Sequence, residues 1–313
     1  MRPAVELINV TKDYGRVRAV DGLSLSVPEE SLYGLIGPNG AGKTTTFAML
    51  SGFLRPTQGE VKVRGRTLTP GQPPVGLALA LPQDAALPDH KRVLATLIYL
   101  ARLGGMPKPE AEARSTRALQ QVGLQDLADR KVSQLSHGQR RRVGIAQTLV
   151  GDDEVIMLDE PTAGLDPRTA VELGQLIKTL SVDRTIILSS HNLAEVESLC
   201  THAAILDRGK LVMSGTMDEI KGTGGLFTVM LAKALAAPTT VQAAVSALAG
   251  VAKVEVAPNA DALRVTTEST EGMDDLTNQV LRVLMDNGAT VKSVERGQSL
   301  TERFMQATRG AGG

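Results

Sequence analysis

A glycine-rich segment near the start of the chain has the residue types and the spacing of a phosphate-binding loop. Its glycines would let backbone N–H groups turn toward phosphate oxygens at the N-terminus of a helix, where the helix dipole also favours anions. The lysine that follows would neutralise the β- and γ-phosphates of a nucleotide, and the next hydroxyl would ligate Mg²⁺. The residues concerned are Gly37, Pro38, Asn39, Gly40, Ala41, Gly42, Lys43 and Thr44, with Thr45 directly after them.

Two adjacent acids end an apolar stretch farther along the chain. Residues 155–158 have the pattern of a buried strand, and Asp159 and Glu160 follow them. In an open α/β sheet such a strand delivers its carboxylates beside the phosphate-binding loop. Asp159 can join the coordination shell of Mg²⁺, and Glu160 can polarise the water that attacks the γ-phosphate. Acids after a strand often merely cap the next helix, but the upstream P-loop favours catalysis.

A covered parallel sheet is the element arrangement that would bring these motifs together. Apolar runs predict strands at 5–10, 23–27, 32–37, 61–63, 75–80, 155–158, 185–188 and 203–206. Helices are expected at 42–51, 93–101, 111–122 and 139–149, from Asp166-Pro167 onward and from Leu193 onward. The apolar stripe of Val93, Leu94, Leu97 and Ile98 is either core or a docking face, and we favour core. The sequence therefore indicates an α/β P-loop core with a mixed β edge and a helical insertion at about 85–150.

The composition limits what the protein can bind. Lys plus Arg and Asp plus Glu are equal at 34 each, so the net charge is zero, and we expect no nucleic-acid partner. The run Arg140 to Arg142 is accordingly expected to be a solvated helix face. Cys200 is the single cysteine and is expected to be a buried, inert thiol. No apolar stretch reaches bilayer length and no secretory signal is visible, so a membrane role requires a partner.

A smaller domain is expected after a glycine-rich joint at 222–225. From 227 onward the predicted strands and helices alternate in the order βαββαβ, which is the ferredoxin-like order. The expected domains are thus 1–221, with the nucleotide chemistry, and 226–313, an α+β accessory domain with no evident chemistry.

The remaining motifs identify a family. A short motif opens the helix that carries the arginine run and consists of Leu135, Ser136, His137, Gly138 and Gln139. Together with the P-loop and the acidic pair, this motif resembles the signature of the nucleotide-binding subunits of ATP-binding cassette (ABC) transporters. The resemblance spans roughly residues 4–220, and further single residues match the family's order: Tyr14, Gln83, Asp166 and His191.

That resemblance implies a role for each matched residue. Tyr14 would stack on adenine, with packing at the core edge as its alternative, and Gln83 would touch Mg²⁺ and the γ-phosphate. His191 would contact the γ-phosphate and orient Glu160 and the water. The signature segment would reach the ATP bound by a second copy, so that two chains form two sites head to tail, and Asp166 would bridge them. The family usually has glycine where this chain has His137, but a working signature is expected.

The resemblance also implies what the ATP chemistry drives. The segment 299–305 resembles the short helix that closes many export-type subunits whose membrane domains are separate polypeptides. We therefore expect an ATPase on the cytoplasmic face of the membrane that powers export through a separate integral membrane permease. A soluble ABC-type ATPase that remodels a protein or nucleic-acid complex is the alternative, and a ligand-sensing role for the C-terminal domain is a third hypothesis.

Overall fold

The chain folds into two compact units, residues 1–214 and 215–313. The computed structural model describes residues 3–69, 76–151, 153–222, 225–269 and 272–309, and the units are taken one at a time below. Of the glycine-rich joint expected at 222–225, residues 223 and 224 lie outside the described part. None of the described helices is long and apolar enough to cross a membrane.

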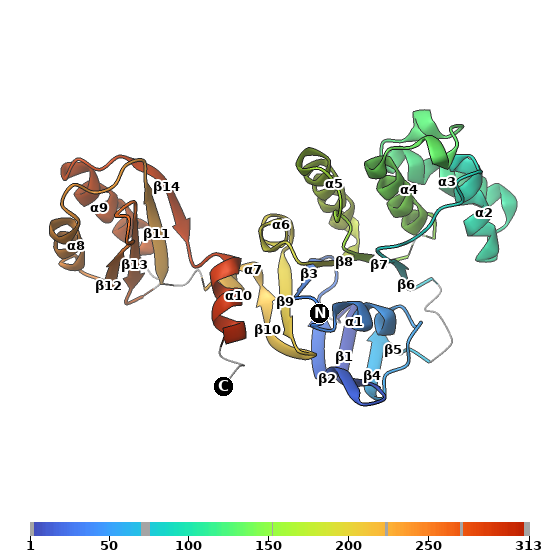
Figure 1. Cartoon of the computed structure of the whole chain (residues 1–313), viewed down its shortest axis with the longest axis horizontal. Coiled ribbons are helices and arrows are strands. Elements are labelled where there is room, and N and C mark those ends of the chain that lie inside the picture. Colours follow the sequence, from blue (N-terminus) through green and yellow to red (C-terminus); the bar gives the residue numbers. More distant parts are fainter. Residues whose placement is uncertain (1–2, 70–75, 152, 223–224, 270–271, 310–313) are drawn as a thin grey trace. The chain divides into compact units, whose positions relative to one another are not determined.

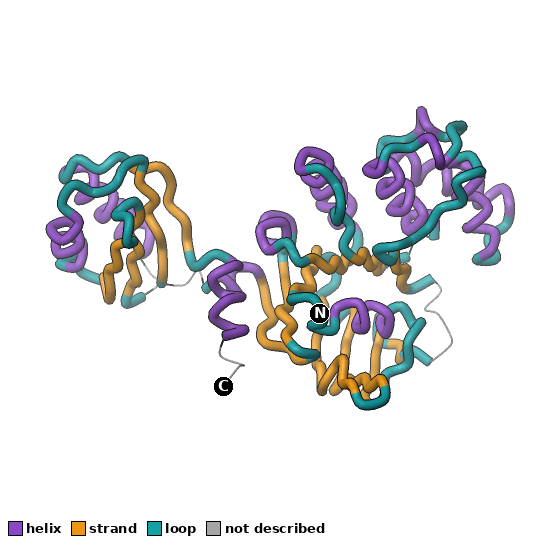
Figure 2. The backbone as a smooth tube through the Cα atoms, in the orientation of Figure 1, coloured by secondary structure: helices purple, strands orange, loops and turns teal. Residues whose placement is uncertain are grey.

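The first unit begins with an antiparallel sheet in the order β2-β1-β4-β5. Figure 2 draws the strands in orange. Its strands are β1 (Val5–Tyr14), β2 (Val17–Val27), β4 (Gln58–Val63) and β5 (Arg66–Thr67). Apolar side chains alternate with polar ones along β1, and Val5, Leu7 and Val10 are buried in the core. The hairpin between β1 and β2 places Tyr14 at its tip, opposite Val17.

A second sheet of six strands has the order β10-β9-β3-β8-β7-β6. Its strands are β3 (Leu32–Ile36), β6 (Ala78–Leu81), β7 (Val155–Asp159), β8 (Thr185–Ser190), β9 (His202–Asp207) and β10 (Lys210–Thr216). All five residues of β3 and of β7 are buried, as the continuous apolar runs predict. The strand expected at 75–80 begins at Ala78, and Val75 lies outside the described residues.

The parallel register of the six-stranded sheet brings the predicted motifs to one edge. Ile36 on β3 lies opposite Ser190 on β8, and Ser189 on β8 lies opposite Asp159 on β7. Leu81 on β6 is in turn paired with Leu158 on β7. The P-loop, the acidic pair, the histidine segment and the segment with Gln83 therefore all leave the sheet at its carboxyl edge, where α/β proteins bind ligands.

Helices complete the first unit (Figure 1). Helix α1 (Lys43–Leu50) packs between the two sheets, against β2 and β4 on one side and β7 on the other. The predicted helical insertion contains α2 (Val93–Leu103), α3 (Lys108–Gln121) and α4 (His137–Val150), with short 3₁₀ turns at Gln125–Leu127 and Val132–Gln134. Helices α5 (Pro167–Leu180) and α6 (Leu193–Leu199) follow, with a 3₁₀ turn at Ser181–Asp183 between α5 and β8. This is the expected mixed α/β P-loop fold.

The apolar stripe of α2 is mainly core, as favoured from the sequence. Val93 and Leu97 are almost completely buried against the neighbouring helices, whereas Leu94 and Ile98 are only half-buried. Helix α2 contacts both α3 and α4, so the insertion has its own small hydrophobic interior.

The second unit contains a four-stranded antiparallel sheet in the order β12-β13-β11-β14. Its elements are α7 (Met217–Lys221), β11 (Leu226–Leu231), α8 (Pro238–Ser246), β12 (Val251–Val256), β13 (Ala262–Thr267), α9 (Met273–Asp286), β14 (Val291–Arg296) and α10 (Leu300–Arg309). The order of β11 to β14 is the βαββαβ arrangement of a ferredoxin-like domain. Helix α10 packs on α7 and is held there by a hydrogen bond of 2.7 Å from Arg303 Nε to the carbonyl of Ile220.

Candidate active site

The P-loop connects β3 to α1 and has a backbone that only glycine accommodates easily. Gly40 and Gly42 have φ values of 83° and 100°, in the left-handed region. A Cβ atom at Gly42 would lie 2.7 Å from the carbonyl oxygen of Ala19 on β2, and one at Gly37 would lie 2.5 Å from that of Leu206. The loop is therefore packed closely against its neighbours at Gly37 and Gly42.

Lys43 occupies the position expected for the phosphate-neutralising cation. Its ammonium group donates a hydrogen bond of 2.7 Å to the carbonyl of Gly37. Burial lowers the pKa of Lys43, while the carboxylates of Glu160 and Asp159 act in the opposite direction. The two acids are thus close enough to Lys43 to stabilise its charge. Thr44, in the first turn of α1, is exposed, and Thr45 is half-buried.

The acidic pair is organised by a residue that the motifs did not identify. The hydroxyl of Ser189 on β8 donates a hydrogen bond to Asp159 Oδ1. It accepts a hydrogen bond of 3.0 Å from the backbone N–H of Glu160. Glu160 itself has a φ of 47°, which is uncommon for a residue with a side chain. The only available signal was the position of Ser189, two residues before His191 at the end of a strand.

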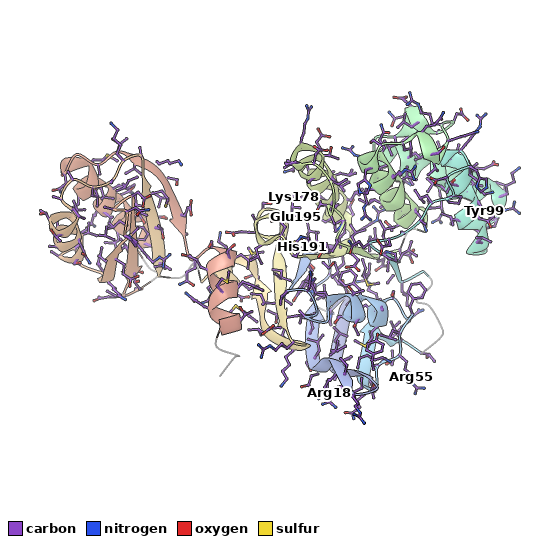
Figure 3. The ribbon with its side chains drawn as sticks, in the orientation of Figure 1. Arg18, Arg55, Tyr99, Lys178, His191 and Glu195 are labelled. Carbon is purple, nitrogen blue, oxygen red and sulfur yellow. The ribbon has the colours of Figure 1, made fainter. Side chains whose placement is uncertain are left out.

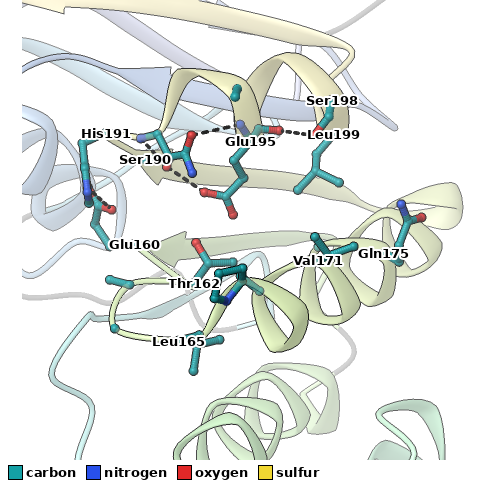
Figure 4. A pocket seen from close by; sticks show the side chains of 17 residues that line it. Glu160, Thr162, Leu165, Val171, Gln175, Ser190, His191, Glu195, Ser198 and Leu199 are labelled. Carbon is teal, nitrogen blue, oxygen red and sulfur yellow. Dashed lines mark hydrogen bonds and ion pairs between the residues drawn. The ribbon is translucent and has the colours of Figure 1, made fainter.

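His191 lies beside Glu160, as the resemblance implied. Its Nδ1 is 2.8 Å from Oε2 of Glu160, and its side chain is 64% exposed, whereas that of Glu160 is 11% exposed. The dashed line between the two side chains in Figure 4 marks this contact. A buried carboxylate thus holds an imidazole whose remaining surface is free to meet a ligand.

The turn that carries His191 is fixed from the other side. Ser190 donates a hydrogen bond of 2.9 Å to Glu195 Oε2 and accepts one of 3.0 Å from the backbone N–H of Asn192. Asn192 caps α6 by accepting a hydrogen bond from the N–H of Glu195. Figure 3 labels His191 and Glu195 near each other, where β8 leads into α6. A cavity of about 540 Å³ opens between this turn and the segment 162–165.

The signature segment starts α4, where its residues cap the helix. Ser136 Oγ accepts a hydrogen bond of 3.2 Å from the N–H of Gln139, and Gln139 Oε1 accepts one of 3.0 Å from the N–H of Ser136. Leu135 is buried, and His137 is exposed. A Cβ atom at Gly138 would lie 2.5 Å from Cγ2 of Thr169 on α5, so glycine is required for the close contact between the two helices.

The structure separates the signature segment from the P-loop of the same chain. Helix α4 contacts β6 and α5, whereas the P-loop follows β3, with β8 and β7 between β3 and β6 in the sheet. Gln83 lies on the side of the signature segment, since its carbonyl accepts a hydrogen bond of 2.6 Å from Arg141 on α4. Gln83 and His137 line one hollow of about 390 Å³.

Asp166 is the N-cap of α5, as its position before Pro167 predicts. Its Oδ1 accepts a hydrogen bond of 3.0 Å from the N–H of Thr169, and hydrogen bonding to Thr169 lowers the pKa of the Asp166 carboxyl. The residue is exposed at the surface of the chain.

Tyr14 is not a core residue. Half of its surface is exposed, and Nζ of Lys12 lies 5.3 Å from the ring centroid. The hairpin that bears Tyr14 also contains Ala19, which meets the P-loop at Gly42. Tyr14 is thus an exposed ring on the hairpin that meets the P-loop through Ala19, and its contact with adenine stays a prediction.

The expectation of a solvated arginine face on α4 is wrong. Arg140, Arg141 and Arg142 are all partly buried. Arg140 pairs with Asp89 at 2.7 Å, Arg141 donates to Gln83 and Arg142 pairs with Glu172 at 3.2 Å. The three side chains tie α4 to neighbouring segments because their partners converge on it from distant parts of the sequence.

The oxygen donors at the sheet edge fit Mg²⁺ held jointly with a nucleotide. Thr44 and Asp159 supply a hydroxyl and a carboxylate, which are hard oxygen ligands. The structure places Gln83, the third predicted ligand, beside α4, so its contact with Mg²⁺ stays a prediction. Within the described residues no group of three or more His, Cys, Asp or Glu side chains could hold a metal. A site with few protein ligands suits Mg²⁺, which keeps waters and binds substrate phosphates.

Fold and site together define a P-loop ATPase. A profile of the protein family described as "ABC transporter" matches residues 20–163. The chain is 38% identical to the uncharacterized ABC transporter ATP-binding protein YhaQ of Bacillus subtilis, over 69% of this chain and 72% of the relative. It is 32% identical to the daunorubicin resistance ATP-binding protein DrrA3 of Streptomyces coeruleorubidus, over 97% of this chain and 96% of the relative.

Solved structures agree with the sequence comparisons. The dimeric ATP-binding cassette MJ0796, in a post-hydrolysis state with ADP and Pi, matches 68% of this chain and 98% of its own, with 25% identity and a TM-score of 0.60. The chain belongs to the family of ABC transporter ATP-binding proteins. It is therefore an ATP-binding and ATP-hydrolysing subunit, and ATPases of this family generally use ATP together with Mg²⁺.

Proposed function

We propose that this chain is the ATPase of an exporter, that two copies of it bind two ATP molecules between them, and that a separate integral membrane permease carries the substrate. The observation that carries the proposal is the set of nucleotide-directed groups at one sheet edge, with Lys43, Asp159, Glu160 and His191 in mutual contact or electrostatic reach. The second observation is that the signature segment at the start of α4, a helix that contacts β6, is separated from the P-loop of its own chain by β8 and β7 in the sheet.

Each residue has a distinct part in hydrolysis. The P-loop N–H groups and Lys43 bind the β- and γ-phosphates, and Tyr14 stacks on adenine. Thr44, Asp159 and Gln83 would hold Mg²⁺, which supplies positive charge to the phosphates when bound. Glu160, held by His191 at 2.8 Å, accepts a proton from the attacking water, and His191 donates a hydrogen bond toward the γ-phosphate.

The second copy completes each site. Ser136 and Gly138, with the helix N-terminus that they open, bind the γ-phosphate on the partner chain. The same segment also contains Leu135, His137 and Gln139. Asp166 bridges the two sites. Support comes from the sheet order, which places the P-loop and α4 apart within one chain, and from the dimeric cassette of similar fold. A symmetric pair satisfies both sites with one interface.

An apolar hollow in the first unit is the surface that suits the permease. It has a volume of about 340 Å³ and lies among α2, β6 and the end of α4. Phe53 at its rim is 77% exposed, and Leu97, Leu100 and Met106 line it. An exposed aromatic ring beside an apolar hollow is typical of a protein–protein contact. The chain would then sit at the cytoplasmic face of the membrane through this partner.

Export is supported by the relative that matches over nearly the whole chain, which is named for daunorubicin resistance. The C-terminal helix α10, expected from the export-type resemblance, is present at Leu300–Arg309.

Purification of the tagged full chain from native membranes tests the proposal. We expect a polytopic membrane protein in stoichiometric amount, and an ATPase rate that changes in its presence. The Phe53→Asp variant should lose this partner but keep ATP binding. Val182→Asp is the matched control, because Val182 is similarly exposed at 70% but does not line the hollow. Recovery of the chain with only cytosolic partners would contradict the proposal and favour a soluble remodelling ATPase.

A further inference from the structure

Ser189 has an unusual set of contacts for a buried serine. Its exposed fraction is 0%, and it lies at the end of β8 directly opposite Asp159. Its one hydroxyl donates to the Asp159 carboxylate and accepts from the Glu160 N–H at 3.0 Å. A single buried hydroxyl therefore contacts both members of the acidic pair, one through the side chain and the other through the backbone.

The backbone of Glu160 is the place where that second contact matters. With a φ of 47°, Glu160 adopts a left-handed conformation that residues with a Cβ rarely adopt unless the surroundings hold them. The hydrogen bond from its N–H to Ser189 holds one side of the residue. On the other side, the carbonyl of Glu160 accepts a hydrogen bond of 3.2 Å from the N–H of Ala163.

The direction of the Glu160 side chain depends on this conformation. In a continuing strand, successive side chains point to opposite faces of the sheet, so the residue after Asp159 would turn its carboxylate away from Asp159 in the regular pattern. In the left-handed conformation of Glu160, its carboxylate instead lies beside Nδ1 of His191, the residue that directly follows β8. Both acids are buried in this arrangement.

We propose that Ser189 is a positioning residue for ATP hydrolysis, whose hydroxyl fixes the Asp159 carboxylate and the left-handed backbone of Glu160 together. Because Ser189 is fully buried, it would act indirectly, by aiming the Glu160 carboxylate at the attacking water. This inference rests on the proposed role of Glu160 as the base. A misdirected base costs rate without weakening the phosphate contacts of Lys43 and of the P-loop N–H groups, because the Ser189 hydroxyl bonds to the acidic pair.

The experiment compares the Ser189→Ala variant of the full chain with the unsubstituted parent chain. We expect kcat to fall about 10- to 100-fold, with the Kd for ATP, measured without Mg²⁺, changed less than about 2-fold. Thr185→Val is the matched control, since Thr185 is a buried hydroxyl at the other end of the same strand and accepts from the N–H of Glu30. Its kcat should stay near that of the parent chain. An unchanged kcat in Ser189→Ala, or an equal loss in both variants, would overturn the proposal.

A double-mutant cycle separates positioning from general stability. In a Glu160→Gln background the base is already gone, so Ser189→Ala should change the single-turnover rate less than about 2-fold. An additional loss as large as in the parent chain would show that Ser189 does not act through Glu160. If Glu160→Gln alone hydrolyses ATP at the parent rate, the proposed role of Glu160 fails instead, so the two failures are distinguishable.

Thermal melting of each variant checks folding. If Ser189→Ala unfolds at the assay temperature, Ser189→Cys takes its place, because a thiol is close in size to a hydroxyl but makes only weak hydrogen bonds. The same loss of kcat is expected for it, and a parent-like kcat in a folded Ser189→Cys chain would overturn the proposal.

Discussion

His191 Nδ1 lies 2.8 Å from Glu160 Oε2, although the two residues are 31 positions apart in the sequence. They meet because β7 and β8 are parallel neighbours and both end at the same edge of the sheet. The contact fixes one nitrogen of the imidazole and leaves the ring exposed. A carboxylate–histidine pair oriented in this way can hold both a water and a phosphate oxygen beside the P-loop.

The P-loop lysine is expected to be essential for nucleotide binding. Lys43→Ala removes a buried cation whose hydrogen bonds to phosphate are worth about 1.5–3 kcal/mol each. ATP affinity should therefore fall at least ~10-fold, measured by isothermal titration calorimetry. Lys210→Ala, which removes an exposed lysine paired with Asp21, should leave the affinity unchanged. Parent-like ATP binding by Lys43→Ala would refute the role of the lysine.

The contact between Gly138 and Thr169 predicts a rescue. Gly138→Ala places a Cβ 2.5 Å from Thr169 Cγ2, which must push α4 away from α5. Overpacking of this kind costs about 1–3 kcal/mol, so both melting temperature and ATPase rate should fall. Thr169→Ser removes that methyl group and keeps the hydroxyl, and the double variant should recover most of both losses. Failure of the second change to restore either one would argue against this packing.

His137 is expected to be replaceable by glycine. It is exposed at the first position of α4, where its Nε2 lies 3.7 Å from the position a Cβ on Gly164 would occupy. Surface changes of this kind usually alter stability by less than about 0.5 kcal/mol. The ATPase rate of His137→Gly should stay close to that of the parent chain. A large loss would mean that the imidazole has a function of its own beside Gly164.

The single cysteine offers a measure of unfolding. Burial raises the pKa of the Cys200 thiol, and the nearby Glu195 carboxylate raises it further, so the thiol stays protonated at pH 8. Cys200 should therefore react with a disulfide reagent only as fast as the chain opens, and at once in denaturant. Rapid reaction of the native chain would show that the segment from α6 to β9 is open in solution.

The motifs were predictable because they fall at fixed places in a parallel sheet. The P-loop follows β3 and the acids follow β7, and parallel strands of an open α/β sheet end at one edge, so their meeting could be inferred from the motifs although β8 lies between the two strands. Ser189 was missed because a serine near a strand end carries no motif; only the register Asp159–Ser189 reveals its role.

The arginine run on α4 was misread for a related reason. The partners of Arg140 and Arg141, which are Asp89 and Gln83, lie 51 and 58 positions earlier in the chain. No local pattern of charge indicates such pairs, and net neutrality says nothing about them. Strand β8 also continues to Ser190, two residues beyond the apolar run that predicted it, because its last two residues are buried hydroxyls.

The most direct test of the account is the Glu160→Gln chain with ATP. Removal of the base should slow hydrolysis at least ~100-fold while leaving the P-loop and the signature segment intact. Two copies should then stay joined around unhydrolysed ATP, and light scattering should give twice the monomer mass with ATP and the monomer mass with ADP. A Glu160→Gln chain that binds ATP but remains a monomer at every protein concentration tested would contradict the composite site.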